Sequence, residues 1–140
     1  MANEWKHLRG PKQTIYVNNN SVAKSKGAPC CFTSHLAVAC ADGGTVDIVL
    51  EQDATANQTH VLACLPNGDI YEVLVASGTT IYNTAAAFMA ATYTVDAGAA
   101  NQNSHMMFVD YDPASAGSCA HIAVWSAKGF PNYYGQADTT

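Results

Sequence analysis

The chain has 140 residues, of which 49% are hydrophobic and 12% are charged, and its formal net charge is −5. This length is enough for one domain with a real hydrophobic core. No apolar stretch approaches the roughly 18 residues needed to cross a bilayer, and the first residues lack the apolar segment of a secretory signal. We therefore expect no membrane association and a chain that is made and kept in the cytosol.

Positive charge is concentrated at the start of the chain. Residues 1–28 carry five positive charges and one negative charge, whereas residues 29–140 carry one positive and ten negative charges. The first segment has no sustained hydrophobic period and one apolar cluster, Ile15 to Val17. It predicts a basic, extended N-terminal arm over residues 1–28 with one short strand, disordered alone and ordered on a partner.

The rest of the chain is a series of short apolar runs separated by turn residues, and the runs are rich in β-branched and aromatic side chains. This pattern is typical of an all-β domain, which we place at residues 29–128. Residues 129–140 are expected to form a tail that lies on the surface. Strands are expected within residues 32–41, 45–51, 92–95, 106–111 and 120–126.

Two apolar runs, residues 60–66 and 69–75, are joined by Asn67 and Gly68. Both central residues of a type I′ turn need positive φ, which Asn and Gly adopt at the least cost. The sequence therefore predicts a β-hairpin at this point.

The alanine-rich residues 85–91 follow Asn83 and Thr84. Alanine has the highest helix propensity, and Asn or Thr can cap a helix, so a helix of about two turns is one interpretation. A strand of small residues is the other. The expected fold class is thus all-β with at most one short helix.

Five cysteines occur without C-x-x-C spacing: Cys30, Cys31, Cys40, Cys64 and Cys119. A reducing compartment would leave them as thiols, which pack as small hydrophobic groups. The neighbours Cys30 and Cys31 would point to opposite faces of a strand, so they are not expected to hold one ion together. The histidines also lack metal-binding spacing, and we expect neither a metal site nor a cofactor.

Two pairs of carboxylates have i, i+2 spacing, Glu51 with Asp53 and Asp110 with Asp112. Such a pair lies on one face of a strand and would suit a Ca²⁺ site or an acid–base pair. Both pairs stand at strand ends beside turn residues, so we interpret them as solvated carboxylates that also form turns, with an ion at Asp110 and Asp112 left open. No G-x-S-x-G motif is present, and we assign no catalytic residue and no enzymatic activity.

Lys6, Arg9 and Lys12 recur at three-residue steps, with Trp5 beside them. Charge combined with an aromatic ring is one pattern of nucleic-acid contact. The acidic remainder of the chain would repel phosphates, however, so an acidic protein surface is the better expectation and nucleic acid is not expected. A solvated tail without a partner is the remaining alternative.

Several stretches resemble the small head decoration proteins of bacteriophages: Lys26 to Pro29 continuing through Val38 and Ala39, Val46 to Leu50, and Leu65 to Glu72. The resemblance covers about residues 15–125. It implies a β-tulip or small β-barrel domain that stabilises the outer surface of an expanded icosahedral capsid, commonly as a homotrimer, with the arm crossing onto a neighbouring subunit.

The resemblance also implies that the partner is the major capsid protein, that the location is the exterior of the virion, and that synthesis takes place in the cytoplasm of a host bacterium. The arm would add Ile15 to Val17 as a strand to a neighbour's open sheet edge, while Lys and Arg steer its approach. The residues expected to contact the capsid are Trp5, Lys6, Arg9, Lys12, Ile15, Tyr16, Val17, Lys24 and Lys26.

Two other interpretations stay open. Another virion component, such as a head fibre base or a tail or spike protein, would share this composition. A soluble carbohydrate-binding β-barrel would stack aromatic side chains on sugar rings, and the candidates for this role are Trp5, Trp125, Tyr133 and Tyr134.

Overall fold

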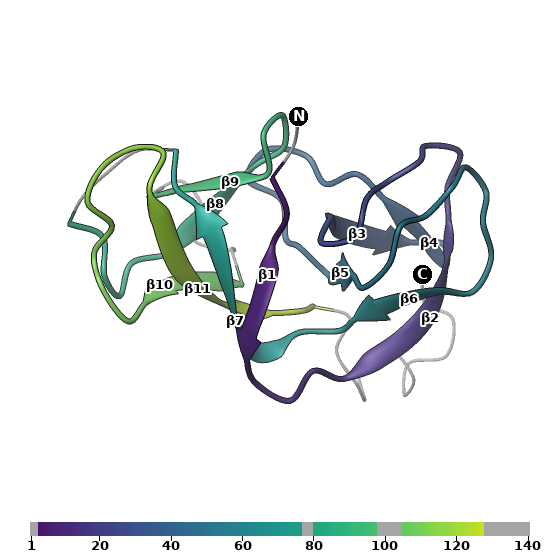
Figure 1. The fold of residues 1–140 in the computed structure, drawn as a ribbon, viewed down its shortest axis with the longest axis horizontal. Helices are drawn as coiled ribbons and strands as arrows, with labels where there is room; N and C mark the ends of the chain where they lie inside the picture. Colours follow the sequence, from purple (N-terminus) through teal and green to yellow (C-terminus); the bar gives the residue numbers. More distant parts are fainter. Residues whose placement is uncertain (1–2, 77–79, 98–104, 128–140) are drawn as a thin grey trace.

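A computed structural model describes residues 3–76, 80–97 and 105–127. These residues form an all-β fold without a helix, which confirms the predicted fold class (Figure 1). The strands are β1 (Lys6–Arg9), β2 (Thr14–Asn19), β3 (Pro29–Thr33), β4 (Leu36–Val38), β5 (Ile48–Leu50), β6 (Val61–Cys64), β7 (Asn67–Leu74), β8 (Ala86–Met89), β9 (Thr94–Ala97), β10 (Met106–Val109) and β11 (Cys119–Trp125).

Five strands close into a small β-barrel in the order β2-β4-β3-β5-β6. All of its strand pairs are antiparallel except β2 with β4, which run parallel. Closure leaves no free sheet edge around this part of the molecule. The interior is filled by a buried cluster that comprises Val17, Ala28, Cys30, Phe32, Ala37, Ile48, Leu50, Ala54, Val61, Ala63 and Leu65.

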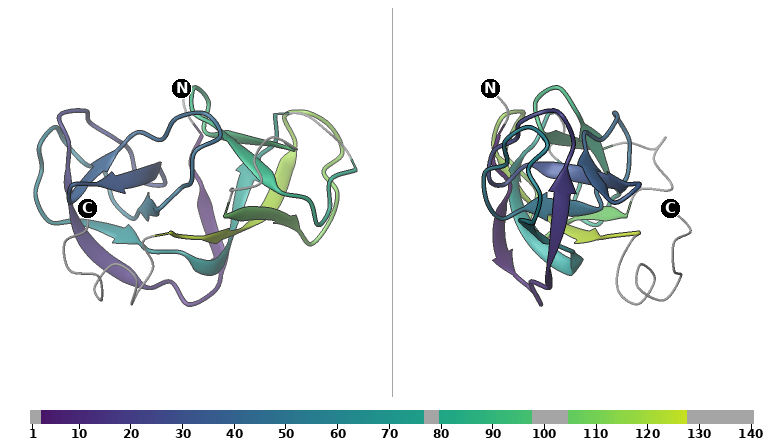
Figure 2. Two further views of the ribbon diagram at one scale, coloured as in Figure 1. Left: turned by 180° about the vertical axis from the view of Figure 1, so that it is seen from behind. Right: turned by 90° about the vertical axis from the view of Figure 1, so that its right-hand side faces the viewer.

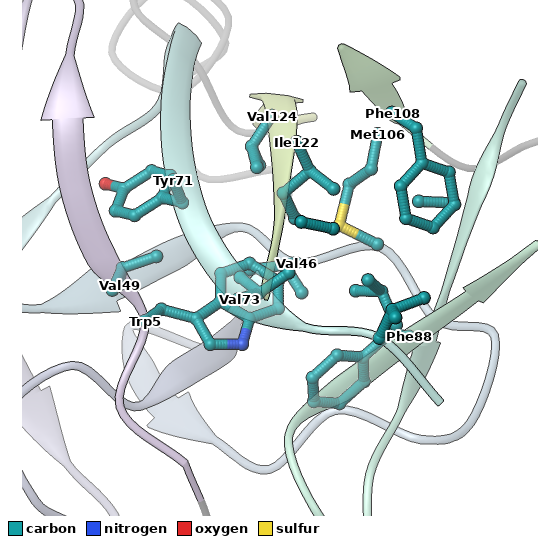
Figure 3. Packing of buried hydrophobic residues seen from close by; sticks show 14 of the residues in the cluster. Trp5, Val46, Val49, Tyr71, Val73, Phe88, Met106, Phe108, Ile122 and Val124 are labelled. Atoms are coloured by element: carbon teal, nitrogen blue, oxygen red, sulfur yellow. The ribbon is translucent and has the colours of Figure 1, made fainter. Parts of the chain in front are cut away.

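The other half of the molecule is an antiparallel sheet with the order β1-β7-β11-β10, and the β8-β9 hairpin lies beside it (Figures 1 and 2). A second buried cluster lies between these elements, and Figure 3 shows its aromatic members converging from three strands and from Trp5, which precedes β1. The Trp5 ring lies 6.1 Å from the Tyr71 ring and 5.9 Å from the Phe88 ring, measured between centroids.

The two halves share one wall of the barrel. On β5, Ile48 and Leu50 belong to the barrel interior, whereas Val49 belongs to the cluster under the sheet. Cys64 of β6 also belongs to that second cluster. A strand buried on both faces reads as a continuous apolar run, which is why residues 48–50 are apolar without alternation.

The N-terminal segment is part of the domain, so the prediction of an extended arm is wrong for residues 3–28. β1 pairs with β7, and β2 pairs with β6 and β4 as a member of the barrel. Trp5 is 2% exposed, and its ring N–H donates to the Tyr93 carbonyl oxygen at 2.8 Å. The apolar residues of this segment are too few for a core of their own, but they complete cores that later strands supply.

The predicted hairpin at residues 60–75 does not form. β6 pairs with β2 and β5, whereas β7 pairs with β1 and β11. Asn67 does not adopt the positive φ that a type I′ turn needs, and only Gly68 does, at +81°. Gly68 is the extra residue where the β7–β11 register shifts beside Trp125, so it forms a β-bulge instead of a turn.

Other predictions have mixed outcomes. The alanine-rich residues 85–91 form the strand β8 and not a helix. The single strand expected over residues 32–41 is two strands, β3 and β4, joined by Ser34 and His35 with φ of +52° and +65°. Strands lie at the other four predicted positions with shifted ends: β5 for residues 45–51, β9 for 92–95, β10 for 106–111 and β11 for 120–126. The tail expected at residues 129–140 lies outside the described residues.

Candidate partner-binding face

The expected capsid-contacting residues divide by burial. Trp5 and Val17 are buried in the two cores, so their side chains are not available to a partner, and Ile15 is half-buried against the barrel core. Tyr16 is 67% exposed and lies near the His60 ring on the outside of the barrel. The alternation along β2 therefore points Tyr16 outward and its two neighbours inward.

Lys24 is held by the barrel itself. Its ammonium donates to the side-chain oxygens of Asn19 and Asn20, both at 2.6 Å, and to the Val22 carbonyl oxygen at 3.0 Å. Partial burial lowers the pKa of Lys24. The lysine closes the loop after β2, and a side chain with three bonds of this kind has little freedom to reach a partner.

Arg9 belongs to a polar cluster on the outer face of the sheet. Its guanidinium donates to Asp110 Oδ1 at 2.7 Å and to Oδ2 at 2.9 Å, and His121 Nδ1 lies 2.7 Å from the same Oδ2. On its other side, His121 Nε2 lies 3.9 Å from a carboxylate oxygen of Glu72. The hydrogen bonds from Arg9 and then His121 hold the pKa of Asp110 below its usual value. The cluster joins side chains of β1, β7 and β11 with that of Asp110, which follows β10. It was not predicted, because its members are distant in sequence.

The predicted carboxylate pairs do not share a ligand or a hydrogen-bond partner among the described residues. Asp112 accepts the backbone N–H groups of Ile81 and Tyr82 at 2.7 and 2.6 Å, whereas Asp110 bonds Arg9 and His121. Asp53 likewise accepts the Lys26 backbone N–H at 2.8 Å. Across the described ranges, no group of three His, Cys, Asp or Glu side chains is placed to hold a metal ion.

A groove of about 210 Å³ lies between β1 and the barrel. Lys12 is paired with Glu51 at 3.3 Å across it, whereas the ammonium groups of Lys6 and Lys26 form no ion pair with any described residue. A larger hollow of about 480 Å³ continues beyond Glu4 and Lys26 toward Lys24 and Tyr93. The groove is lined by Glu4, Trp5, Lys6, His7, Lys12, Lys26, Gly27, Leu50 and Glu51.

A buried carboxylate fixes one wall of this groove. Asp69 is 0% exposed, and its oxygens contact His7 Nε2 at 2.7 Å, the Lys12 backbone N–H at 2.8 Å and the Asn67 backbone N–H at 2.7 Å. Gly10 passes so close that a Cβ there would lie 2.8 Å from Asp69 Cα, and its φ of +124° also requires glycine. Asp69 therefore holds both ends of the β1–β2 connection.

None of the five cysteines is in a disulfide bond. Cys30 belongs to the barrel core and Cys31 packs against the other core, so the two point to opposite faces as predicted. Cys31 and Cys40 both donate to the Thr45 carbonyl oxygen, at 3.0 and 3.7 Å. Burial raises the pKa of Cys30 to about 12 and that of Cys64 to about 11, so these thiols stay protonated.

Comparison with known proteins gives no relative from which a role could be transferred. No family model, curated protein or solved structure matches the chain. Among the described residues, no helix has the length and apolar character needed to cross a membrane.

Proposed function

We propose that the chain is a structural virion protein that decorates the outer surface of an icosahedral phage capsid and binds the major capsid protein. The observation that carries the proposal is the grouping of lysines from the N-terminal segment around one groove, in a protein whose residues 29–140 have a net charge of −9. A localised basic face on an acidic body favours one docking orientation on an acidic protein surface. The resemblance to head decoration proteins supports the same role.

The folded position of the N-terminal segment changes the mechanism of attachment. Ile15 to Val17 pair with β6 as part of the closed barrel, so they do not belong to a separate arm that could leave the domain. Attachment is instead assigned to the folded face that Lys6, Lys12 and Lys26 border. This arrangement needs no disorder-to-order transition on binding and therefore avoids its entropic cost.

A decoration protein acts through the number of its copies. Trimers at the three-fold positions of the shell would place several grooves against neighbouring capsid subunits, and each weak contact would add to the total resistance of the shell to internal pressure. This role requires neither enzymatic activity nor a cofactor.

The carbohydrate-binding alternative has lost its main support. Trp5 is buried and bonded to Tyr93, so it cannot stack on a sugar, and Tyr133 and Tyr134 lie outside the described residues. Trp125, at 42% exposed, is the only one of the four candidates that the structure describes as accessible.

The copy number of the chain in purified virions tests the proposed function. Quantitative mass spectrometry should give an integral ratio to the major capsid protein, which corresponds to hundreds of copies per particle. A few copies per particle would instead identify a fibre, tail or spike component, and absence from virions would contradict the proposal.

A further inference from the structure

We propose that the groove beside β1 binds an extended acidic segment of the partner, which adds to the free edge of β1 as a further strand. This inference rests on the proposed function for the identity of the partner, but the groove itself defines the chemistry that it accepts.

At His7, the edge of β1 that faces away from β7 has no strand partner among the described residues. β1 is the edge strand of its sheet and pairs only with β7 among the described strands. The Trp5 backbone N–H points away from β7, because it donates to the Gly27 carbonyl oxygen at 3.0 Å. Hydrogen-bonding direction alternates along a strand, so the N–H and C=O of His7 also point away from β7, toward the groove.

The segment that faces β1 across the groove makes one backbone hydrogen bond with it, between Trp5 and Gly27, and then leaves the strand. The Gly27 backbone N–H donates to the Leu50 carbonyl oxygen at 2.8 Å, which anchors residue 27 to the barrel. Gly27 therefore starts a pairing with β1 that no described segment continues past Trp5. The space that remains is the groove of about 210 Å³, whose lining includes His7, Gly27 and Leu50. It has room for a short piece of extended chain.

The charge of the groove selects an acidic segment. Lys12 and Glu51 neutralise one another at 3.3 Å, which leaves Lys6 and Lys26 opposed by Glu4 alone among the lining residues. Two lysines without carboxylate partners can pair with acidic side chains of an added strand and steer its approach. Backbone pairing with His7 supplies the remaining interaction, as in other cases of strand addition.

The backbone groups at the edge of β1 favour a peptide over a nucleic acid. The outward N–H and C=O groups of an edge strand match a peptide backbone, whereas a phosphodiester chain has no alternating donors and acceptors to pair with them.

The test uses the full-length chain, labelled with ¹⁵N, and an acetylated and amidated eight-residue peptide that alternates Asp with Thr. A peptide that alternates Lys with Thr serves as the charge control. The variant Lys6→Gln/Lys26→Gln removes the two unpaired charges. Ala56→Glu/Thr59→Glu changes the net charge by the same amount on the exposed loop before β6, away from β1.

The Asp/Thr peptide should shift the amide resonances of His7 and its neighbours in a saturable manner at low salt, and should slow hydrogen exchange at the His7 amide. The Lys6→Gln/Lys26→Gln variant should bind about tenfold more weakly, and the loop variant should match the parent chain. Equal binding of both peptides, undiminished binding by the lysine variant, or no effect at the His7 amide would each overturn the proposal.

The peptide experiment does not involve capsids, so its outcome separates this inference from the proposed function. Peptide binding at β1 by a chain that is absent from virions would uphold the groove and refute the capsid role. A chain that is abundant in virions but does not bind the peptide would support the capsid role and refute the peptide site.

Discussion

His7 Nε2 lies 2.7 Å from Asp69 Oδ2, and this contact joins the edge strand β1 to the beginning of β7. The same oxygen accepts the Lys12 backbone N–H, and the second oxygen accepts the Asn67 backbone N–H. A single buried carboxylate thus fixes the path of the chain as it leaves the sheet and enters the barrel. The groove that borders β1 depends on this arrangement.

Replacing Asp69 should be strongly destabilising. Asp69→Ala leaves the His7 ring and two backbone N–H groups without their acceptor in a buried place. Loss of one member of a buried polar network typically costs about 3–5 kcal/mol. Urea denaturation followed by circular dichroism measures the free energy of unfolding. The control is Asp53→Ala, whose carboxylate accepts one N–H at the surface, and equal losses in the two variants would contradict the assigned role of Asp69.

Replacing Tyr71 with Phe should leave the protein as stable or make it more stable. The Tyr71 hydroxyl is buried and makes no hydrogen bond of good geometry with any described residue, although the Cys64 thiol lies beside it. Burial and this thiol both raise the pKa of Tyr71. An unsatisfied buried hydroxyl costs about 1–3 kcal/mol, so its removal should raise the free energy of unfolding by up to about 1 kcal/mol. A loss of more than about 1 kcal/mol would show that the hydroxyl has a strong partner.

Deleting residues 1–28 should unfold the protein. The deletion removes β1, the barrel strand β2 and the buried Trp5 ring, and a barrel without one of its strands exposes two sheet edges and its core. Loss of the β-sheet signal in far-ultraviolet circular dichroism and of cooperative thermal unfolding would confirm this. A truncated chain that folds and unfolds cooperatively would restore the interpretation of an independent arm.

The thiols should react at very different rates with a maleimide at about pH 8. Cys119 is exposed, whereas burial raises the pKa of Cys30 to about 12 and that of Cys64 to about 11. A raised pKa keeps the thiol protonated, and the reactive thiolate forms only as the pH approaches that value. Peptide mapping by mass spectrometry should find Cys119 modified first, with all five modified together in guanidinium. Early labelling of Cys30 would contradict its place in the barrel core.

Local patterns in the sequence identified the fold class but not the pairing of the strands. Short apolar runs rich in β-branched residues correctly predicted strands, and strand geometry correctly predicted the opposed directions of Cys30 and Cys31. The barrel was an expectation of the resemblance to head decoration proteins alone. The run of residues 60–75 contained a turn signal, but pairing with distant strands placed Gly68 in a bulge. Register over long sequence separations is a tertiary property that a turn dipeptide does not determine.

The residues of the candidate site were chosen from the sequence, but their expected conformation, an extended arm, was wrong. The concentration of lysines before Gly27 singles out the N-terminal segment as a candidate contact, and this stays a prediction. The sparse apolar residues of the segment suggest a lack of structure, which the fold contradicts. Trp5 and Val17 instead complete cores that other strands build, and this cannot be inferred from the segment alone. The contact of Arg9 with Asp110 and that of His7 with Asp69 join residues far apart in sequence, so only the fold brings them together.

The folded basic face is proposed to attach this chain to a capsid. Cosedimentation with empty expanded capsids of the phage proposed to carry its gene tests this most directly. The full-length chain should bind to saturation at an integral ratio to the major capsid protein. At low salt the Lys6→Gln/Lys26→Gln variant should bind about tenfold more weakly than the parent chain, with the difference shrinking as salt screens the charges. Failure of the full-length chain to sediment with the capsids would contradict the account.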